Sequence, residues 1–108
     1  MIALVCRASG LAGLVVLATG LGAAAETIHV TIDKMSFTPA EVRVQVGDTI
    51  VWDNKDVFAH TVTVRGGPWD LVMPAKKSAE IVAGTAGTFN YYCRFHPNMV
   101  ARVIVADR

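Results

Sequence analysis

The sequence has only two cysteines, no helical hydrophobic period of useful length, and no excess of charge of either sign. A formal net charge of +1 excludes the basic footprint expected of a nucleic-acid-binding protein. Charged residues make up only 18% of the chain and apolar residues 53%, which excludes an intrinsically disordered protein. Because 108 residues suffice for one domain but not for two, we expect a single globular domain.

The most apolar part of the chain lies at its start. Residues 8–25 carry no charge, follow Arg7, and end in three alanines immediately before Glu26. A basic start, an apolar stretch and small residues at its end are typical of a secretory signal peptide. A retained transmembrane anchor is the alternative, but the stretch is only marginally long enough to span a bilayer and no basic cluster follows it. We therefore expect cleavage after Ala25, which would leave a periplasmic domain of residues 26–108 without a membrane segment.

Cleavage changes what the two cysteines can do. Cys6 leaves with residues 1–25, so Cys93 becomes the only cysteine and an intramolecular disulfide is impossible. Small exported domains usually rely on disulfides, so this one must rely on its core or on a bound metal. Arg7 leaves as well, which makes basic and acidic residues equal in number and argues against strong steering by net charge. The unpaired thiol of Cys93 therefore calls for a chemical role.

Short runs in which apolar and polar residues alternate recur along the rest of the chain, separated by turn-forming residues. We expect a turn or strand edge at residues 36–39 and irregular structure at residues 69–77, because prolines interrupt both patterns. With no helix to cover a sheet face, two apolar faces must pack on each other, which predicts an all-β Greek-key β-sandwich or small barrel. The predicted strands are residues 27–33, 41–46, 49–52, 60–64, 79–82, 88–93 and 100–105.

The loop before the last predicted strand concentrates metal-binding side chains. Cys93, His96 and Met99 follow one another at a spacing of three, and His60 begins an earlier strand. A soft thiolate and thioether combined with two imidazoles suit copper better than the other common metals. A trigonal Cys and two His with a weak axial Met is the geometry of copper sites that transfer electrons. Pro97 stiffens this loop and holds the residue before it in an extended conformation.

Each of these residues also has a purely structural interpretation. Cys93 could be a small buried hydrophobe, and Met99 a gap-filler in the core. His96 could be a surface histidine in a loop, and His60 a histidine at a strand start with a satisfied ring. The four residues together, in a Cys-x2-His-x2-Met loop with one upstream histidine, favour the copper site.

Other sites fit the residue counts less well. A structural zinc site needs four Cys or His ligands, and His29 falls on the polar face of its strand, where we expect it to face solvent. The Cys-x2-Cys-His motif of a c-type haem is absent. A Cys–His nucleophile pair has suitable residue types, but it lacks an evident oxyanion loop and 83 residues leave little room for a substrate cleft. Met35 and Met73 compete as axial ligands, but neither shares a loop with the other ligands, so we favour Met99.

Residues 46–52, 59–62 and 87–99 resemble the cupredoxins, the family of blue copper proteins, and the resemblance covers nearly all of residues 26–108. It implies an eight-stranded Greek-key sandwich with one copper ion, whose second loop histidine reaches the surface and passes the electron. Thr61 stands where related members have an asparagine that ties the two ligand segments together, so we expect a looser tie. Arg94 in the ligand loop is unusual, and its charge should favour Cu(I) and raise the reduction potential. The ligands that the resemblance implies are His60, Cys93, His96 and Met99.

The leading hypothesis is a monomeric periplasmic carrier of single electrons between a dehydrogenase or a c-type cytochrome and an acceptor. It would not be an enzyme, because a saturated, buried copper leaves no open position for a substrate. Phe95 and Pro97 beside His96 would form the docking patch for a weak, transient encounter. One alternative is a copper-delivery protein of the same fold with the same ligands. Another is a metal-free sandwich that binds a protein partner.

Overall fold

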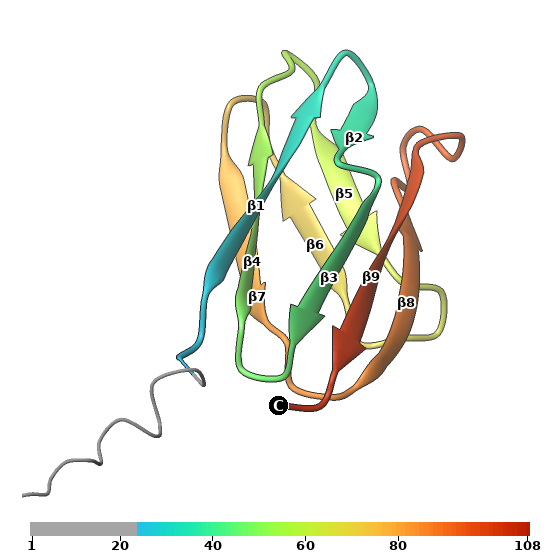
Figure 1. Ribbon diagram of the computed structural model, residues 1–108. Helices are drawn as coiled ribbons and strands as arrows, with labels where there is room; N and C mark the ends of the chain where they lie inside the picture. Colours follow the sequence, from blue (N-terminus) through green and yellow to red (C-terminus); the bar gives the residue numbers. More distant parts are fainter. Residues whose placement is uncertain (1–23) are drawn as a thin grey trace, which may run out of the picture.

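The computed structural model describes residues 24–108, so the expected signal peptide falls almost entirely outside the described residues. Two β-sheets face each other in this part of the chain, which contains no helix and therefore none that could span a bilayer (Figure 1). The all-β sandwich prediction is confirmed. The strands are β1 (Thr27–Asp33), β2 (Ser36–Thr38), β3 (Glu41–Gln45), β4 (Thr49–Asn54), β5 (His60–Thr63), β6 (Asp70–Met73), β7 (Ser78–Val82), β8 (Gly87–Tyr92) and β9 (Val100–Ala106).

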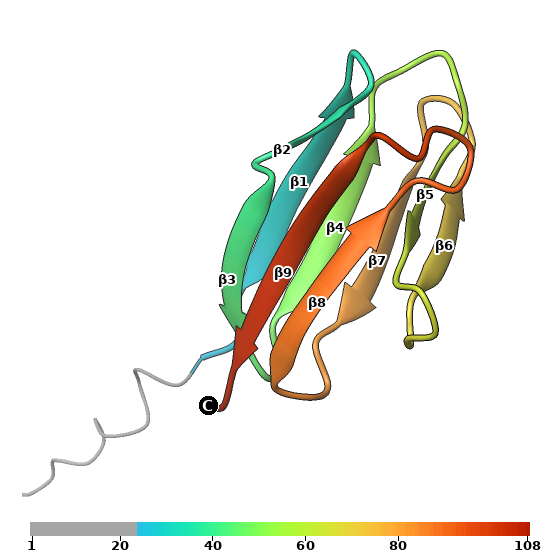
Figure 2. The ribbon, with the colours of Figure 1, turned by 90° about the vertical axis from the view of Figure 1, so that its right-hand side faces the viewer.

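The strand order brings four loops to one end of the sandwich. One sheet has the order β2-β1-β4-β7 and the other β3-β9-β8-β5-β6. β1 runs parallel to β4 and β3 runs parallel to β9, and parallel neighbours cannot be joined by a tight hairpin. The chain therefore crosses between the sheets, as Figure 2 shows from the side. The β1–β2, β4–β5, β6–β7 and β8–β9 connections meet at one end, while the described chain begins and ends at the other (Figure 1).

An aromatic cluster joins the two sheets below these loops. Trp52 on β4 is fully buried and donates its indole N–H to the phenol oxygen of Tyr91 on β8 over 3.1 Å. The rings of Trp52, Trp69, Phe37 and Tyr91 pack edge to face, an arrangement that aromatic quadrupoles favour. Burial raises the pKa of Tyr91 to about 12, so the phenol stays neutral and keeps its hydrogen bond. This cluster gives the metal-free fold a rigid centre without a disulfide.

The sequence pattern missed one strand and underestimated the count. β6 lies within residues 69–77, which were expected to be irregular. Its four residues pair with β5 between Pro68 and Pro74, which lie just outside the ladder and take no part in its hydrogen bonds. β6 is also the edge of its sheet, where a short strand beside prolines is tolerated. With β6 and the three-residue β2 counted, the described chain has nine strands rather than seven or eight.

Candidate metal centre

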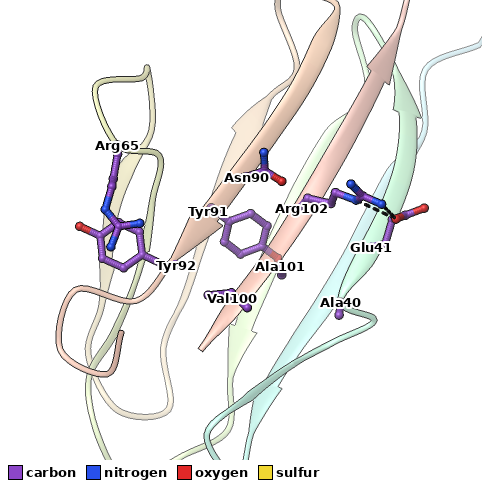
Figure 3. A pocket seen from close by; sticks show the side chains of 9 residues that line it. All are labelled: Ala40, Glu41, Arg65, Asn90, Tyr91, Tyr92, Val100, Ala101 and Arg102. Carbon is purple, nitrogen blue, oxygen red and sulfur yellow. Dashed lines mark hydrogen bonds and ion pairs between the residues drawn. The ribbon is translucent and has the colours of Figure 1, made fainter. Parts of the chain in front are cut away.

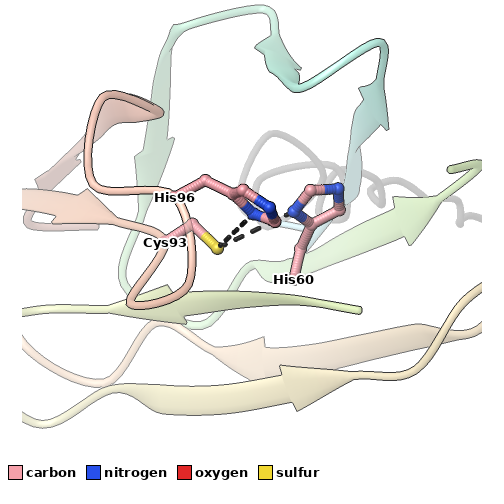
Figure 4. A group of neighbouring side chains, drawn as sticks. All are labelled: His60, Cys93 and His96. Carbon is pink, nitrogen blue, oxygen red and sulfur yellow. Dashed lines mark hydrogen bonds between the residues drawn. The ribbon is translucent and has the colours of Figure 1, made fainter. Parts of the chain in front are cut away.

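Three predicted ligands converge at the end where the loops meet. His60 is the first residue of β5, Cys93 follows the last residue of β8, and His96 lies in the β8–β9 loop. One ligand atom from each of the three lies within 4.8 Å of the others. Figure 4 shows the sulfur of Cys93 pointing toward both imidazole rings. Strand β5 thus holds one of the ligands, and the loop between β8 and β9 supplies the other two.

The distances among these atoms fit a single metal ion. The Cys93 Sγ atom lies 3.7 Å from Nδ1 of His60 and 3.7 Å from Nδ1 of His96. Thiolate and imidazole bonds of about 2.3 and 2.0 Å, at angles between tetrahedral and trigonal, require a separation of about 3.5–3.7 Å. His60 and Cys93 are fully buried, whereas His96 is partly exposed. The donor set of one sulfur and two nitrogens therefore suits a soft metal with low coordination number, of which copper is the best match.

Asp56 holds the ring of His60 from the other side. Its Oδ2 atom lies 2.8 Å from Nε2 of His60, so Nε2 carries the proton and donates it to the carboxylate. In the neutral ring, this hydrogen bond leaves the lone pair of Nδ1 facing Cys93. A carboxylate behind a ligating histidine fixes its tautomer and raises its basicity, as at other metal sites.

The same carboxylate anchors the β1–β2 turn. It accepts the backbone N–H groups of Lys34 and Met35 over 2.7 and 3.1 Å. Burial raises the pKa of Asp56, but the hydrogen bonds from the Met35 amide, the His60 ring and the Lys34 amide outweigh burial and hold the pKa below its usual value. Asp56 is therefore ionised at neutral pH and binds the turn and the ligand ring together. The sequence alone did not point to Asp56, because its only signal is its position four residues before His60.

Thr61 reaches the ligand loop by two hydrogen bonds. Its backbone N–H points at Cys93 Sγ over 3.3 Å, and its Oγ1 accepts the backbone N–H of Arg94 over 2.8 Å. A looser tie was expected because a hydroxyl has fewer donors than an amide. The structure shows that the Thr61 hydroxyl nevertheless accepts a hydrogen bond from the backbone N–H of Arg94, the residue directly after Cys93. The backbone N–H of Thr61 thus holds the sulfur of Cys93 in place from the β5 side.

The ligand loop is closed by backbone hydrogen bonds. The amide of Cys93 donates to the carbonyl of Met99, and the amide of Met99 donates to the carbonyl of His96. Met99 is buried, whereas Met35, one of its competitors as axial ligand, is 37% exposed. Met73, the other competitor, is buried on β6 opposite His60. The role of Met99 as axial ligand stays a prediction.

His96 opens onto an apolar surface. It lines a hollow together with Met35, Phe95 and Pro97, and the exposed ring of Phe58 lies edge-on to its imidazole. His29, by contrast, is exposed on the first sheet and pairs with Asp53, as expected for a histidine outside the site. The site therefore has two buried proposed ligands, His60 and Cys93, and one partly exposed proposed ligand, His96, which is surrounded by apolar side chains.

Comparison with known proteins places this geometry in context. A family model described as a cupredoxin-like domain matches residues 6–105. Amicyanin-alpha of Methylorubrum extorquens is 33% identical over 89 residues, which cover 77% of this chain and 75% of that protein. Amicyanin of Paracoccus denitrificans is 39% identical over 84 residues, which cover 72% of this chain and 64% of that protein.

Solved structures show the same likeness. The crystal structure of amicyanin from Paracoccus versutus superposes with a TM-score of 0.68 at 30% identity and covers 73% of this chain and 80% of that one. A reduced, Cu(I) form of an amicyanin variant superposes with a TM-score of 0.69 at 32% identity, over 73% of this chain and 81% of that one. The fold of the present chain thus agrees with that of the amicyanins, and its sequence matches the cupredoxin-like family model.

Proposed function

This chain belongs to the cupredoxin-like family, and from that premise we propose that it is a blue copper protein that carries single electrons between redox partners. The observation that carries the proposal is the convergence of Cys93 Sγ with Nδ1 of His60 and of His96, each 3.7 Å from the sulfur. One copper ion held there would supply one-electron redox chemistry. His60, Cys93 and His96 are its proposed ligands, with Met99 as the weak axial fourth.

The surrounding residues prepare the site for both oxidation states. Asp56 keeps the proton of His60 on Nε2, and the amide of Thr61 stabilises negative charge on the sulfur. Because these partners belong to the folded chain, the ligands need little rearrangement when the charge at the centre changes. Small rearrangement is what a rapid electron carrier needs, and His60 and Cys93 are both fully buried. We therefore place the protein among carriers rather than enzymes.

The partner would dock on the apolar rim of His96. Phe58, Phe95 and Met35 expose large apolar side chains there, and Pro97 completes the hollow. A patch of this kind supports a small, transient interface, which a dehydrogenase or a c-type cytochrome needs in order to leave after one electron. The imidazole of His96 is the proposed exit for the electron, and the protein itself would act as a monomer.

Export and cleavage after Ala25 complete the proposal. The backbone nitrogen of Glu26 lies 2.9 Å from Oδ1 of Asp48, so the α-ammonium group that cleavage creates would find a carboxylate in place. That pairing supports a mature periplasmic chain beginning at Glu26. Mass spectrometry of the chain isolated from a periplasmic fraction checks it, and an intact residue 1–25 segment would overturn it.

The function is tested by adding Cu(II) to the metal-free protein. We expect an intense blue thiolate-to-copper band at one copper per chain and a reversible one-electron wave. Cys93→Ser should abolish the band, while the matched variant His29→Gln, on an exposed histidine, should keep it. A colourless wild-type protein would sink the proposal. Rapid loss of copper to an acceptor protein, without reversible cycling, would replace the carrier by a copper-delivery protein.

A further inference from the structure

Four hydrogen bonds close a ring beside the metal centre. The backbone N–H of Arg94 donates to Thr61 Oγ1 over 2.8 Å, and Thr61 Oγ1 lies 2.9 Å from Thr63 Oγ1. Thr63 donates to Oδ1 of Asp70 over 2.8 Å, and Nε of Arg94 donates to the same oxygen over 2.9 Å. Arg94 of the ligand loop therefore closes the ring, because both its backbone N–H and its guanidinium take part.

The ring has only one possible polarity. A carboxylate is acceptor-only, so the single hydroxyl proton of Thr63 must point to Asp70. Thr61 must then donate to Thr63, which leaves its lone pair for the Arg94 amide. Both threonines are buried, so water cannot replace these partners without cost. The hydrogen bonds from Thr63 and Arg94 also hold the pKa of Asp70 below its usual value, in keeping with an ionised acceptor.

One residue of this hydrogen-bonded ring, Thr61, also contacts the proposed copper ligand Cys93. Thr61, whose hydroxyl the ring orients, directs its amide at Cys93 Sγ. We propose that Asp70, on edge strand β6, is a positioning residue of the metal centre, which locks the ligand loop onto β5 through Thr63 and Thr61 on one side and Arg94 on the other. The inference rests on the proposed copper function for its electronic effect, but the locking itself belongs to the metal-free chain.

The ring also changes what Arg94 does. Its guanidinium was expected to favour Cu(I) as a nearby positive charge, and the structure pairs it with Asp70. Asp70 therefore has two separable effects. Its oxygen fixes geometry through the hydrogen bonds, and its charge offsets that of Arg94.

Two substitutions separate these effects. Thr63→Val removes the hydroxyl at nearly constant shape and keeps both charges, whereas Thr63→Ser keeps the hydroxyl and should restore wild-type behaviour. Asp70→Asn keeps an oxygen that accepts both hydrogen bonds but removes the charge. The control is Glu41→Gln, because Glu41 and Arg102 form a similar pair at 2.8 Å on β3 and β9 of the same sheet, apart from the ring (Figure 3).

The first measurement is amide hydrogen exchange of Arg94 by NMR in the metal-free full-length domain. We expect exchange about fivefold or more faster in Thr63→Val, a smaller change in Asp70→Asn, and none in Thr63→Ser or Glu41→Gln. Unchanged exchange in a folded Thr63→Val protein would overturn the lock. Should Thr63→Val not fold, Asp70→Leu, which removes both acceptor bonds from an exposed position, replaces it with the same expected result.

The second measurement is the reduction potential of the copper-loaded variants. Asp70→Asn should raise it, because the charge of Arg94 is then uncompensated and favours Cu(I), and Glu41→Gln should leave it unchanged. A potential that falls or stays constant in Asp70→Asn would overturn the charge effect. Failure of the wild-type protein to turn blue would instead count against the copper function, while the exchange measurement would still decide whether the ring locks the loop.

Discussion

Two histidine–aspartate pairs in this molecule have the same nitrogen–oxygen distance of 2.8 Å, yet only one belongs to the proposed copper site. In the His60–Asp56 pair the side chains are 0% and 11% exposed, and the bond uses Nε2, which leaves Nδ1 facing Cys93. In the His29–Asp53 pair they are 61% and 24% exposed, and the bond uses Nδ1 itself. The same chemical pair therefore supports a proposed metal ligand in one place and lies exposed, outside the proposed site, in the other.

The difference lies in burial and in which ring nitrogen is occupied. A largely buried pair keeps its geometry because little water competes for the carboxylate, whereas an exposed pair gains little over hydration. Asp56 is further tied to two backbone amides of the β1–β2 turn, while Asp53 accepts from His29 and the hydroxyl of Ser78. We therefore infer that His60 is suited to be a ligand because the fold fixes its Nε2 atom and directs its Nδ1 atom toward Cys93.

The sharpest test of this comparison replaces each histidine in turn. His60→Gln should remove the blue band altogether, because it deletes one of the two strong nitrogen ligands. His29→Gln should leave the band and the copper stoichiometry unchanged. Absorbance during Cu(II) titration measures both, and a blue band that survives in His60→Gln would show that the ligand set is wrong.

Replacing the two aspartates tests the role of the partner. Asp56→Asn leaves His60 in place but removes the carboxylate that fixes its tautomer, so copper affinity should fall about 10–100-fold. Asp53→Asn should leave affinity unchanged, because its histidine is not a ligand. Competition with a chelator of known affinity measures both, and equal affinities for the two variants would contradict the assignment of Asp56.

How far the sequence predicts this arrangement depends on the distance between partners along the chain. Cys93, His96 and Met99 stand on one loop, so their spacing pointed to a metal directly, and His29 fell on the polar face of a strand by simple alternation. Asp56 and Asp70 carry no motif, because their partners are set by the crossing of β-strands. Asp56 accepts hydrogen bonds from the backbone N–H groups of Lys34 and Met35, which lie more than 20 residues away in the sequence.

The strands divide in the same way. Alternation located β1 at its full length, because its apolar residues lie on one face, where Val30 and Ile32 are buried and Ile28 is partly buried. β6 was missed because its four residues are too few for a clear period and its flanking prolines suggest a loop. Its partner β5 pairs with it residue by residue, and that pairing is what makes it a strand. Local pattern thus predicted the sandwich and the ligand loop, and tertiary pairing supplied the residues that hold the ligands in place.

In the metal-free protein, we expect substitutions in the His60–Asp56 and His29–Asp53 pairs to differ less in their effect on stability than in their effect on copper affinity. Asp56→Ala leaves two turn amides and a buried imidazole without their acceptor, so we expect a loss of about 1–3 kcal/mol in the free energy of unfolding. Asp53→Ala removes an exposed pair and should cost less than about 1 kcal/mol. Urea unfolding without copper measures both losses. A larger loss for Asp53→Ala would contradict the expectation that the buried pair contributes more to stability than the exposed pair.

The smallest expected effect is the acid response of the exposed pair. The hydrogen bonds from the His29 ring and the Ser78 hydroxyl hold the pKa of Asp53 below its usual value. A lowered folded-state pKa adds stability that is present above the unfolded value of about 3.9 and is lost as the pH falls through the folded value. Asp53→Asn should therefore be less stable than wild type at pH 7, by roughly 0.2–1 kcal/mol, and the gap should narrow as the pH falls below about 4. Urea midpoints at pH 7 and pH 3 measure this gap. His29→Gln should likewise reduce the loss of stability on acidification, because it removes the hydrogen bond that contributes most to lowering the pKa of Asp53. A stability difference between wild type and Asp53→Asn that widens toward pH 3 would show that these partners do not hold Asp53 in its ionised form.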